Sequence, residues 1–222
     1  MNSAPVRPCS SRPIMLTAGV LLPLVLLLGL ACGPTPTARD ASPIVVSEDP
    51  AQEAVDRPQA VILKRGRIEY RLTPKARYTL RGIVLSRSGY SYDAMAKLAP
   101  CDMAMCWGEL VKGRQYAQLK WSQSMRWYWW KYGEGFGHDE TWVARWSSNS
   151  HIIPADENLE RAAKSLKEGQ PAELEGDLVF VNWTAGGETR WWRSSLTRDD
   201  QGNGSCEILY LRRVKQGGKV YE

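Results

Sequence analysis

The pattern of apolar and polar positions changes twice along this chain of 222 residues. An uncharged apolar run occupies residues 14–31, and a polar segment follows it. From about residue 67 onward, apolar positions mostly recur at every second residue, which is the period of a β-strand. Within 171–183, for example, Ala172 and Leu174 alternate with Glu173 and Glu175. The pattern predicts a mainly β domain.

Further segments have a strand-like pattern and are separated by clusters of Gly, Asn and Asp. We expect strands over residues 77–88, 103–111, 116–121, 125–132, 171–183, 189–196 and 206–214. One helix is expected over 156–167, because Leu159, Ala162 and Leu166 follow the helical period. Gly169 is placed to end it in a left-handed cap.

The order strand, strand, strand, helix, strand, strand is that of the OB-fold, a five-stranded Greek-key barrel. The chain fits this order when its elements are assigned as follows: 77–88, 103–111 and 116–132 as the first three strands, 171–183 and 206–214 as the last two. The fold class predicted is a small antiparallel barrel or sandwich with one α-helix, in its more specific form OB-like.

The N-terminal segment has the layout of a secretory signal peptide, with Arg7 and Arg12 ahead of the apolar run 14–31. Its end, Leu30-Ala31-Cys32-Gly33, resembles the lipobox of bacterial lipoproteins, although Gly29 stands where that family usually has Leu. The resemblance implies a signal helix over 1–31, cleavage before Cys32 and a lipid anchor on Cys32. The alternatives are an ordinary signal peptide or an uncleaved membrane anchor, since about 18 apolar residues just reach spanning length. All three place the remaining chain outside the cytoplasm.

Two further segments complete the predicted organisation. Residues 32–57 are rich in Pro, Ala, Ser, Thr and acidic residues and too poor in large apolar side chains to bury a core, so we expect a flexible linker. Residues 58–222 form the β-rich globular domain. The net charge of +5 is modest, and basic and acidic residues are interspersed. Because nucleic-acid binders normally carry a dense basic stripe, no nucleic-acid partner is expected.

Ten tryptophans lie between Trp107 and Trp192, against two phenylalanines in the whole chain. Large indole rings can serve as core in a β-domain with few other large apolar residues. Within 127–132, however, alternation sends Trp127 and Trp129 to one face and Tyr128 and Trp130 to the other. The second interpretation is therefore an exposed aromatic platform for glycan or protein.

The cysteines suggest an oxidising compartment. With Cys32 assigned to lipid, Cys101, Cys106 and Cys206 remain in the domain. If Cys101 and Cys106 share a strand, their odd separation puts them on opposite faces, so we expect one disulfide between Cys206 and either of them. Their spacing does not match a metal site, and no metal or cofactor is expected.

Residues 147–154, Ser-Ser-Asn-Ser-His-Ile-Ile-Pro, precede the expected helix and contain His151. No G-x-S-x-G elbow accompanies these serines, and such a run is typical of loop side chains that bond the backbone near a helix start. A catalytic role would need a carboxylate near His151, with Asp199 and Glu207 as the candidates.

Four strings resemble a group of bacterial envelope proteins of unassigned function: 107–108, 148–154, 174–179 and 194–207. The resemblance covers residues 77–214, brings no activity with it, and implies that the loop around His151 and the hairpin from Arg198 to Glu207 are similar across the group. The candidate binding residues are Trp107, Arg126, Trp130, Asn149, His151, Arg198 and Glu207.

Two hypotheses follow. The first is a non-catalytic module, lipid-anchored through Cys32 and facing the periplasm or cell surface, that binds a cell-wall glycan or an envelope protein through aromatic side chains. The alternative is a hydrolase of envelope polymers that uses His151 with Asp199 or Glu207.

Overall fold

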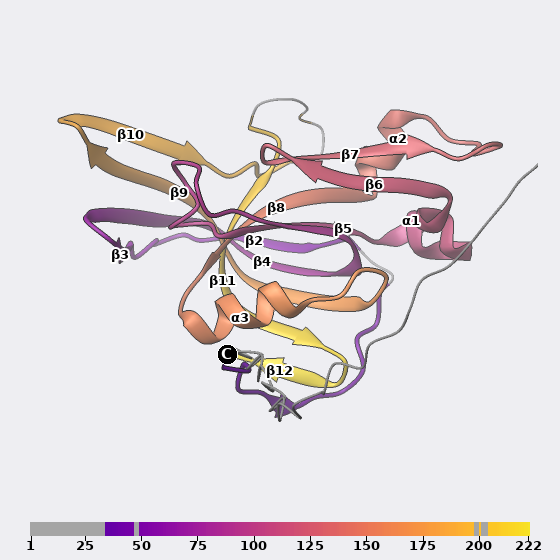
Figure 1. Ribbon diagram of the computed structural model, residues 1–222, viewed down its shortest axis with the longest axis horizontal. Helices are drawn as coiled ribbons and strands as arrows, with labels where there is room; N and C mark the ends of the chain where they lie inside the picture. Colours follow the sequence, from indigo (N-terminus) through magenta and orange to yellow (C-terminus); the bar gives the residue numbers. More distant parts are fainter. Residues whose placement is uncertain (1–33, 47–48, 198–199, 201–203) are drawn as a thin grey trace, which may run out of the picture. The chain divides into compact units, whose positions relative to one another are not determined.

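The computed structural model describes residues 34–222 except 47–48, 198–199 and 201–203 (Figure 1). The expected signal helix, the lipidation site Cys32, Arg198 and Asp199 lie outside the described residues. The described part is mainly β and also contains three α-helices and one 3-10 helix. Of its helices, none is long and apolar enough to cross a membrane.

The elements have the following bounds. The strands are β1 (Arg39–Asp40), β2 (Ala51–Ala54), β3 (Val61–Arg65), β4 (Ile68–Gly89), β5 (Cys101–Cys106), β6 (Leu119–Ser124), β7 (Trp127–Tyr132), β8 (Ser147–Pro154), β9 (Pro171–Ala185), β10 (Glu188–Arg193), β11 (Glu207–Gln216) and β12 (Lys219–Tyr221). The helices are α1 (Gly108–Val111), the 3-10 helix η1 (Lys112–Gln118), α2 (Glu140–Arg145) and α3 (Glu157–Ser165).

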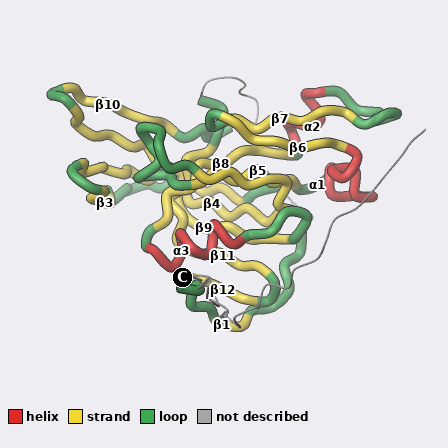
Figure 2. Tube along the Cα trace, viewed as in Figure 1, coloured by secondary structure: helices red, strands yellow, loops and turns green. Residues whose placement is uncertain are grey.

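Ten of these strands form one sheet, in which β1, β12, β11, β8, β5, β4, β9 and β10 follow one another and β2 and β3 also pair with β4. The strands β6 and β7 form a separate hairpin (Figure 2). The longest strand, β4, has 22 residues. Its side chains Tyr70, Leu72, Tyr78 and Leu80 are buried at every second position, because alternate residues of a strand point to the same face.

Five strands pair in a circuit, since β9 pairs with β11 as well as with β4: β4 with β5, β5 with β8, β8 with β11, β11 with β9, and β9 with β4. Beyond the circuit, β4 and β9 run on and form hairpins with β3 and β10, which extend to the same side in Figure 1. Five further strands extend the sheet beyond this circuit, so the structure as a whole is a large sheet and not a closed barrel. The prediction is confirmed in its coarser form, a mainly β domain.

Three apolar clusters form the core. The first collects side chains from all five strands of the circuit and from α3. The second lies between the two hairpins and the loop 90–100. The third lies under β6 and β7, where Tyr128 and Trp130 pack against Ala104 and Leu119.

The helix α3 confirms the expected helix. It begins at the predicted place because the Asp156 side chain accepts a hydrogen bond of 2.9 Å from the backbone N–H of Leu159. It ends at Ser165, earlier than expected. Gly169 has a φ of 76° but lies beyond the helix, where its N–H donates to the carbonyl of Val84 at 2.8 Å.

The third strand of the circuit is β8 and not the predicted segment 116–132, which forms η1, β6 and β7. Residues 147–154 were expected to be a loop, yet every one of them is buried in a strand. The physical reason is that β8 pairs with β5 on one edge and with β11 on the other, so its backbone groups are satisfied although five of its eight side chains are polar. The segment 103–111 is also shorter as a strand than predicted, because α1 begins at Gly108.

The segment 34–57, predicted to be a flexible linker, contacts the domain through two short strands and through side chains such as Asp49, which pairs with Arg145. The strand β1 pairs with β12, and β2 pairs with β4. Both strands are exposed, so they bury no core of their own. Their pairing depends on backbone hydrogen bonds, which composition does not reveal.

Candidate functional site

A cavity of about 390 Å³ opens where four parts of the chain meet. It lies between the loop 90–100 that joins β4 to β5, the tip of the β6–β7 hairpin, β8, and the residues Trp192, Arg193, Gly204 and Cys206 ahead of β11. Its lining residues are Asp93, Ala94, Met95, Arg126, Trp127, His151, Trp192, Arg193, Gly204 and Cys206. Charged groups and two indole rings thus share one site.

Arg126 is the most connected side chain at this site. Its guanidinium donates hydrogen bonds of 3.0 Å to the Asp102 carboxylate and to the Ala99 carbonyl, and two of 2.9 Å to Asp93. It also lies over the Tyr90 ring, with 4.0 Å between the guanidinium carbon and the ring centroid. Because Asp102 is fully buried, this arginine supplies the positive charge that the buried carboxylate needs.

The backbone that carries Arg126 is in an unusual conformation. Met125 and Arg126 form the two-residue tip of the hairpin, with φ values of 51° and 69°. Tips of this kind favour Asn-Gly, because other side chains are strained at positive φ. The contacts of the guanidinium offset that strain, which ties the hairpin tip to Asp102.

The buried carboxylate of Asp102 also approaches His151. Its Oδ1 lies 2.9 Å from His151 Nδ1, and the His151 side chain is 6% exposed. Neither His151 Nδ1 nor Asp102 Oδ2 makes a hydrogen bond to another described residue. The Trp192 ring packs against the imidazole with 4.7 Å between ring centroids. The Asp102 carboxylate therefore lies against two residues that line the cavity, Arg126 and His151.

Asn149 connects the hairpin tip to β8. Its side-chain oxygen accepts a hydrogen bond of 2.6 Å from Gln123, and its amide donates one of 3.1 Å to the Arg126 carbonyl. The same amide lies 3.9 Å from the sulfur of Cys206. This buried side chain holds the cavity wall in place and does not itself line the cavity.

The Cys206 thiol faces the cavity but is poorly suited to be a nucleophile. Burial, reinforced by the negative charges of Glu207 and Asp102, raises its pKa to about 12. The reactive form of cysteine is the thiolate, which is scarce at neutral pH under these conditions.

The predicted disulfide is not present in the described part of the chain, where Cys101, Cys106 and Cys206 are all free. Cys101 and Cys106 do lie on opposite faces of β5, in different core clusters, as their odd separation predicts. The obstacle is β8, which runs between β5 and the start of β11, next to Cys206. Two strand spacings are about 9–10 Å, beyond the Cα separation that a disulfide allows.

The structure brings three predicted binding residues together at or beside the cavity: Arg126, Asn149 and His151. Glu207 is buried next to the site, opposite Ser150 in the β8–β11 register, and does not line the cavity. Trp107 is fully buried in the core, where its indole N–H donates to Asp49 at 3.1 Å.

The sequence analysis did not single out several residues of the site, among them Asp93, Asp102, Trp192 and Arg193. Asp102 could have been predicted from the sequence, because it is the one charged residue in an otherwise uncharged strand, Cys101–Cys106. All six residues of this strand are buried. A buried carboxylate needs a partner, so this position pointed to a polar site.

The aromatic strand β7 has the two faces that alternation predicts. Tyr128 and Trp130 point inward and contact Trp121, whereas Trp127 and Trp129 pair on the outer face with 6.4 Å between ring centroids. Trp129 is 56% exposed. Trp130, predicted to bind a ligand, belongs instead to the apolar layer under the hairpin.

In the part of the chain that the structure describes, no group of three or more His, Cys, Asp or Glu residues is arranged to hold a metal ion. Comparisons with protein-family models, with curated proteins and with solved structures find no match to this chain.

Proposed function

We propose that this chain is a non-catalytic ligand-binding module of the bacterial envelope, lipid-anchored through Cys32 and facing the periplasm or cell surface. In this proposal the cavity around Arg126, His151 and Trp192 is its binding site, and a cell-wall glycan is its ligand. The observation that carries the proposal is the place of the cavity in the fold.

The position of the cavity corresponds to the position at which OB-folds bind their ligands. We propose that the circuit is OB-like: its strands β4, β5, β8, β9 and β11 follow the OB order, α3 lies between the third and fourth, and the third and fifth, β8 and β11, run parallel. OB-folds bind ligands on the face of strands 2 and 3, between the loop that joins strands 1 and 2 and the loop that joins strands 4 and 5. The corresponding parts here are β5 and β8, the loop 90–100 and the segment 186–206, and all but β5 supply lining residues.

The side chains at the cavity suit a sugar. Trp127 and Trp192 offer flat apolar rings against which the apolar face of a sugar ring can pack. Asp93 and Arg193 are charged groups at the same opening and can hydrogen-bond hydroxyl groups. Most ligand sites combine apolar walls with a few placed polar groups in this way.

The Asp102–His151 contact favours one alternative, a hydrolase in which His151 acts as a base oriented by a carboxylate. The carboxylate would be Asp102, since Glu207 does not line the cavity and Asp199 lies outside the described residues. Against this alternative, His151 Nδ1 makes no hydrogen bond to a described residue, so the carboxylate does not orient the imidazole as a catalytic base requires. The binding module is therefore the preferred function.

The test is calorimetric titration of the full chain, in uncharged detergent, with soluble cell-wall fragments that contain the disaccharide repeat. Trp192→Ala should abolish binding, because the ring lines the cavity. Trp191→Ala is the matched control, since its neighbouring ring is 64% exposed and lies outside the cavity. Equal binding by both variants contradicts the proposed site, and turnover of the fragments by the unaltered chain supports the hydrolase.

Anchoring has its own test. A cell that expresses the chain should incorporate labelled fatty acid into it, and the Cys32→Ser variant should lose the label while still carrying the domain. Retention of the label by Cys32→Ser contradicts lipidation at this cysteine.

A further inference from the structure

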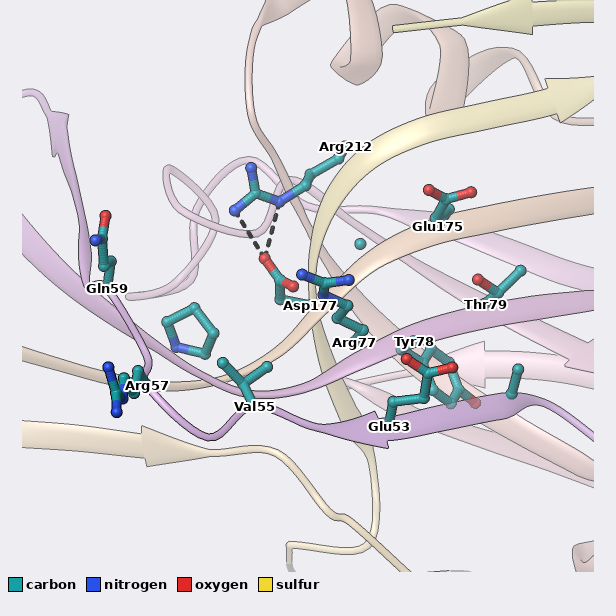
Figure 3. Close-up of a pocket in the computed structure, with 13 residues that line it drawn as sticks. Glu53, Val55, Arg57, Gln59, Arg77, Tyr78, Thr79, Glu175, Asp177 and Arg212 are labelled. Carbon is teal, nitrogen blue, oxygen red and sulfur yellow. Dashed lines mark hydrogen bonds and ion pairs between the residues drawn. The ribbon is translucent and has the colours of Figure 1, made fainter.

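A second and larger hollow, of about 600 Å³, has a different set of lining residues. Its floor is formed by β4, β9 and β11, and its wall by residues 51–59, which include β2 (Figure 3). We call it the arginine groove, because Arg57, Arg77 and Arg212 line it. It shares no lining residue with the cavity described above.

The acidic groups on the floor of the groove already have arginine partners. Asp177 lies 2.8 Å from the guanidinium of Arg212, and the two point toward each other in Figure 3. Glu175 forms an ion pair with Arg213, which lies beside the groove. These carboxylates are therefore neutralised within the protein.

Arg57 and Arg77 differ in this respect, since neither has a hydrogen bond or an ion pair to another described residue. Glu53 is the remaining carboxylate of the lining and stands directly opposite Arg77 in the β2–β4 register, also without an ion pair among the described residues. Arg77 also stands opposite Asp177 in the β4–β9 register, but that carboxylate is already paired with Arg212. Arg57, Arg77 and Glu53 are therefore the charged groups of the groove that have no ion pair among the described residues. A surface ion pair with Glu53 would contribute little, about 1 kcal/mol at most, so a stronger acceptor could displace it.

We propose that the arginine groove binds a phosphate group. Guanidinium groups bind phosphate through paired, charge-assisted hydrogen bonds, which are stronger than neutral ones. The groove also offers neutral donors in the Thr79 hydroxyl and the Gln59 amide. Arg57 comes from the wall and Arg77 from the floor, so a phosphate group in the groove has guanidinium donors on two sides (Figure 3).

The phosphate group has two sources, a free phosphate compound or the headgroup of an anionic phospholipid. The experiment uses the full chain in uncharged detergent with its arginine side chains labelled for NMR. Inorganic phosphate is titrated first, and then a short-chain phosphatidylglycerol, with short-chain phosphatidylcholine as the zwitterionic control. A response to phosphatidylglycerol but not to phosphatidylcholine identifies the lipid source, and a response to inorganic phosphate alone identifies the free compound.

Arg77→Gln should weaken phosphate binding about tenfold or more, which corresponds to the loss of one charged hydrogen-bond partner. Arg71→Gln is the matched control, because Arg71 is exposed on the same strand but does not line the groove. Thermal melts of both variants should match the unaltered chain, since both side chains are exposed. Absence of phosphate binding, or equal loss in both variants, overturns the proposal. Trp192→Ala should leave phosphate binding intact, so the glycan site and the phosphate site fail independently.

Discussion

Replacement of Asp102 by Asn is the sharpest test of how the cavity is held together. The change keeps the size of the side chain but removes the charge that faces both Arg126 and His151. Asp102 is fully buried and the Arg126 side chain is 16% exposed, so the arginine cannot regain full hydration without moving the hairpin tip.

The magnitude follows from this burial. Removal of one partner from a buried ion pair destabilises a protein by about 3–5 kcal/mol. Arg126 keeps its bonds to Asp93 and to the Ala99 carbonyl, so we expect the lower end, about 3 kcal/mol. For a domain of this size, that corresponds to a fall in melting temperature of roughly 6–12 °C.

The assay is denaturant unfolding of four proteins: the unaltered chain, Asp102→Asn, Arg126→Met and the double variant. If the two groups stabilise each other, the double variant should lose less stability than the sum of the single losses, by about 1–3 kcal/mol. Asp93→Asn is the control, because Asp93 binds the same arginine at a more exposed position and should lose about 1 kcal/mol or less. Additive losses for Asp102 and Arg126 would refute the coupling.

Three further predictions concern single sites. Gly176→Ala should destabilise the domain by roughly 1–3 kcal/mol, because a Cβ there would lie 2.0 Å from a backbone oxygen of β11. Gly89→Ala is the control, since a Cβ at that position has no atom within 4 Å. Chemical denaturation of the two variants compares their free energies of unfolding. Cys206, whose pKa is about 12, should react slowly with iodoacetamide at pH 8 in the native protein and quickly after unfolding; rapid native labelling, read by mass spectrometry, contradicts its burial. Trp129→Phe should reduce the acrylamide-accessible fluorescence more than Trp130→Phe, because Trp129 is 56% exposed. An equal reduction by both variants would show that both rings are exposed to solvent.

Periodicity predicted much of the secondary structure, because a strand with one apolar face shows alternating apolar and polar residues within its own short segment. The helix α3 was predicted by the same means, although the role of Asp156 as its N-cap was not. The strand β8 was missed because its Ser-Ser-Asn-Ser start looks like a loop. The strand forms because β5 and β11 pair with both of its edges and satisfy its backbone groups, and that pairing joins segments far apart in the sequence.

The candidate site was predicted in part for the same reason. His151, Arg126 and Asn149 were chosen individually, and their proximity depends on the β6–β7 hairpin folding over β5 and β8. The turn residues Met125 and Arg126 do not predict a tight hairpin, because positions with positive φ are usually Gly or Asn. Tertiary contacts of the guanidinium override the local preference here.

The central claim is that the cavity beside β8 is the ligand site, and an NMR titration of the ten indole N–H groups tests it most directly. The full chain would be titrated with the soluble cell-wall disaccharide fragment. The signals of Trp127 and Trp192 should shift and saturate together, while that of Trp191 stays in place. Unchanged signals for Trp127 and Trp192, or shifts confined to Trp129 and Trp191, would contradict the account.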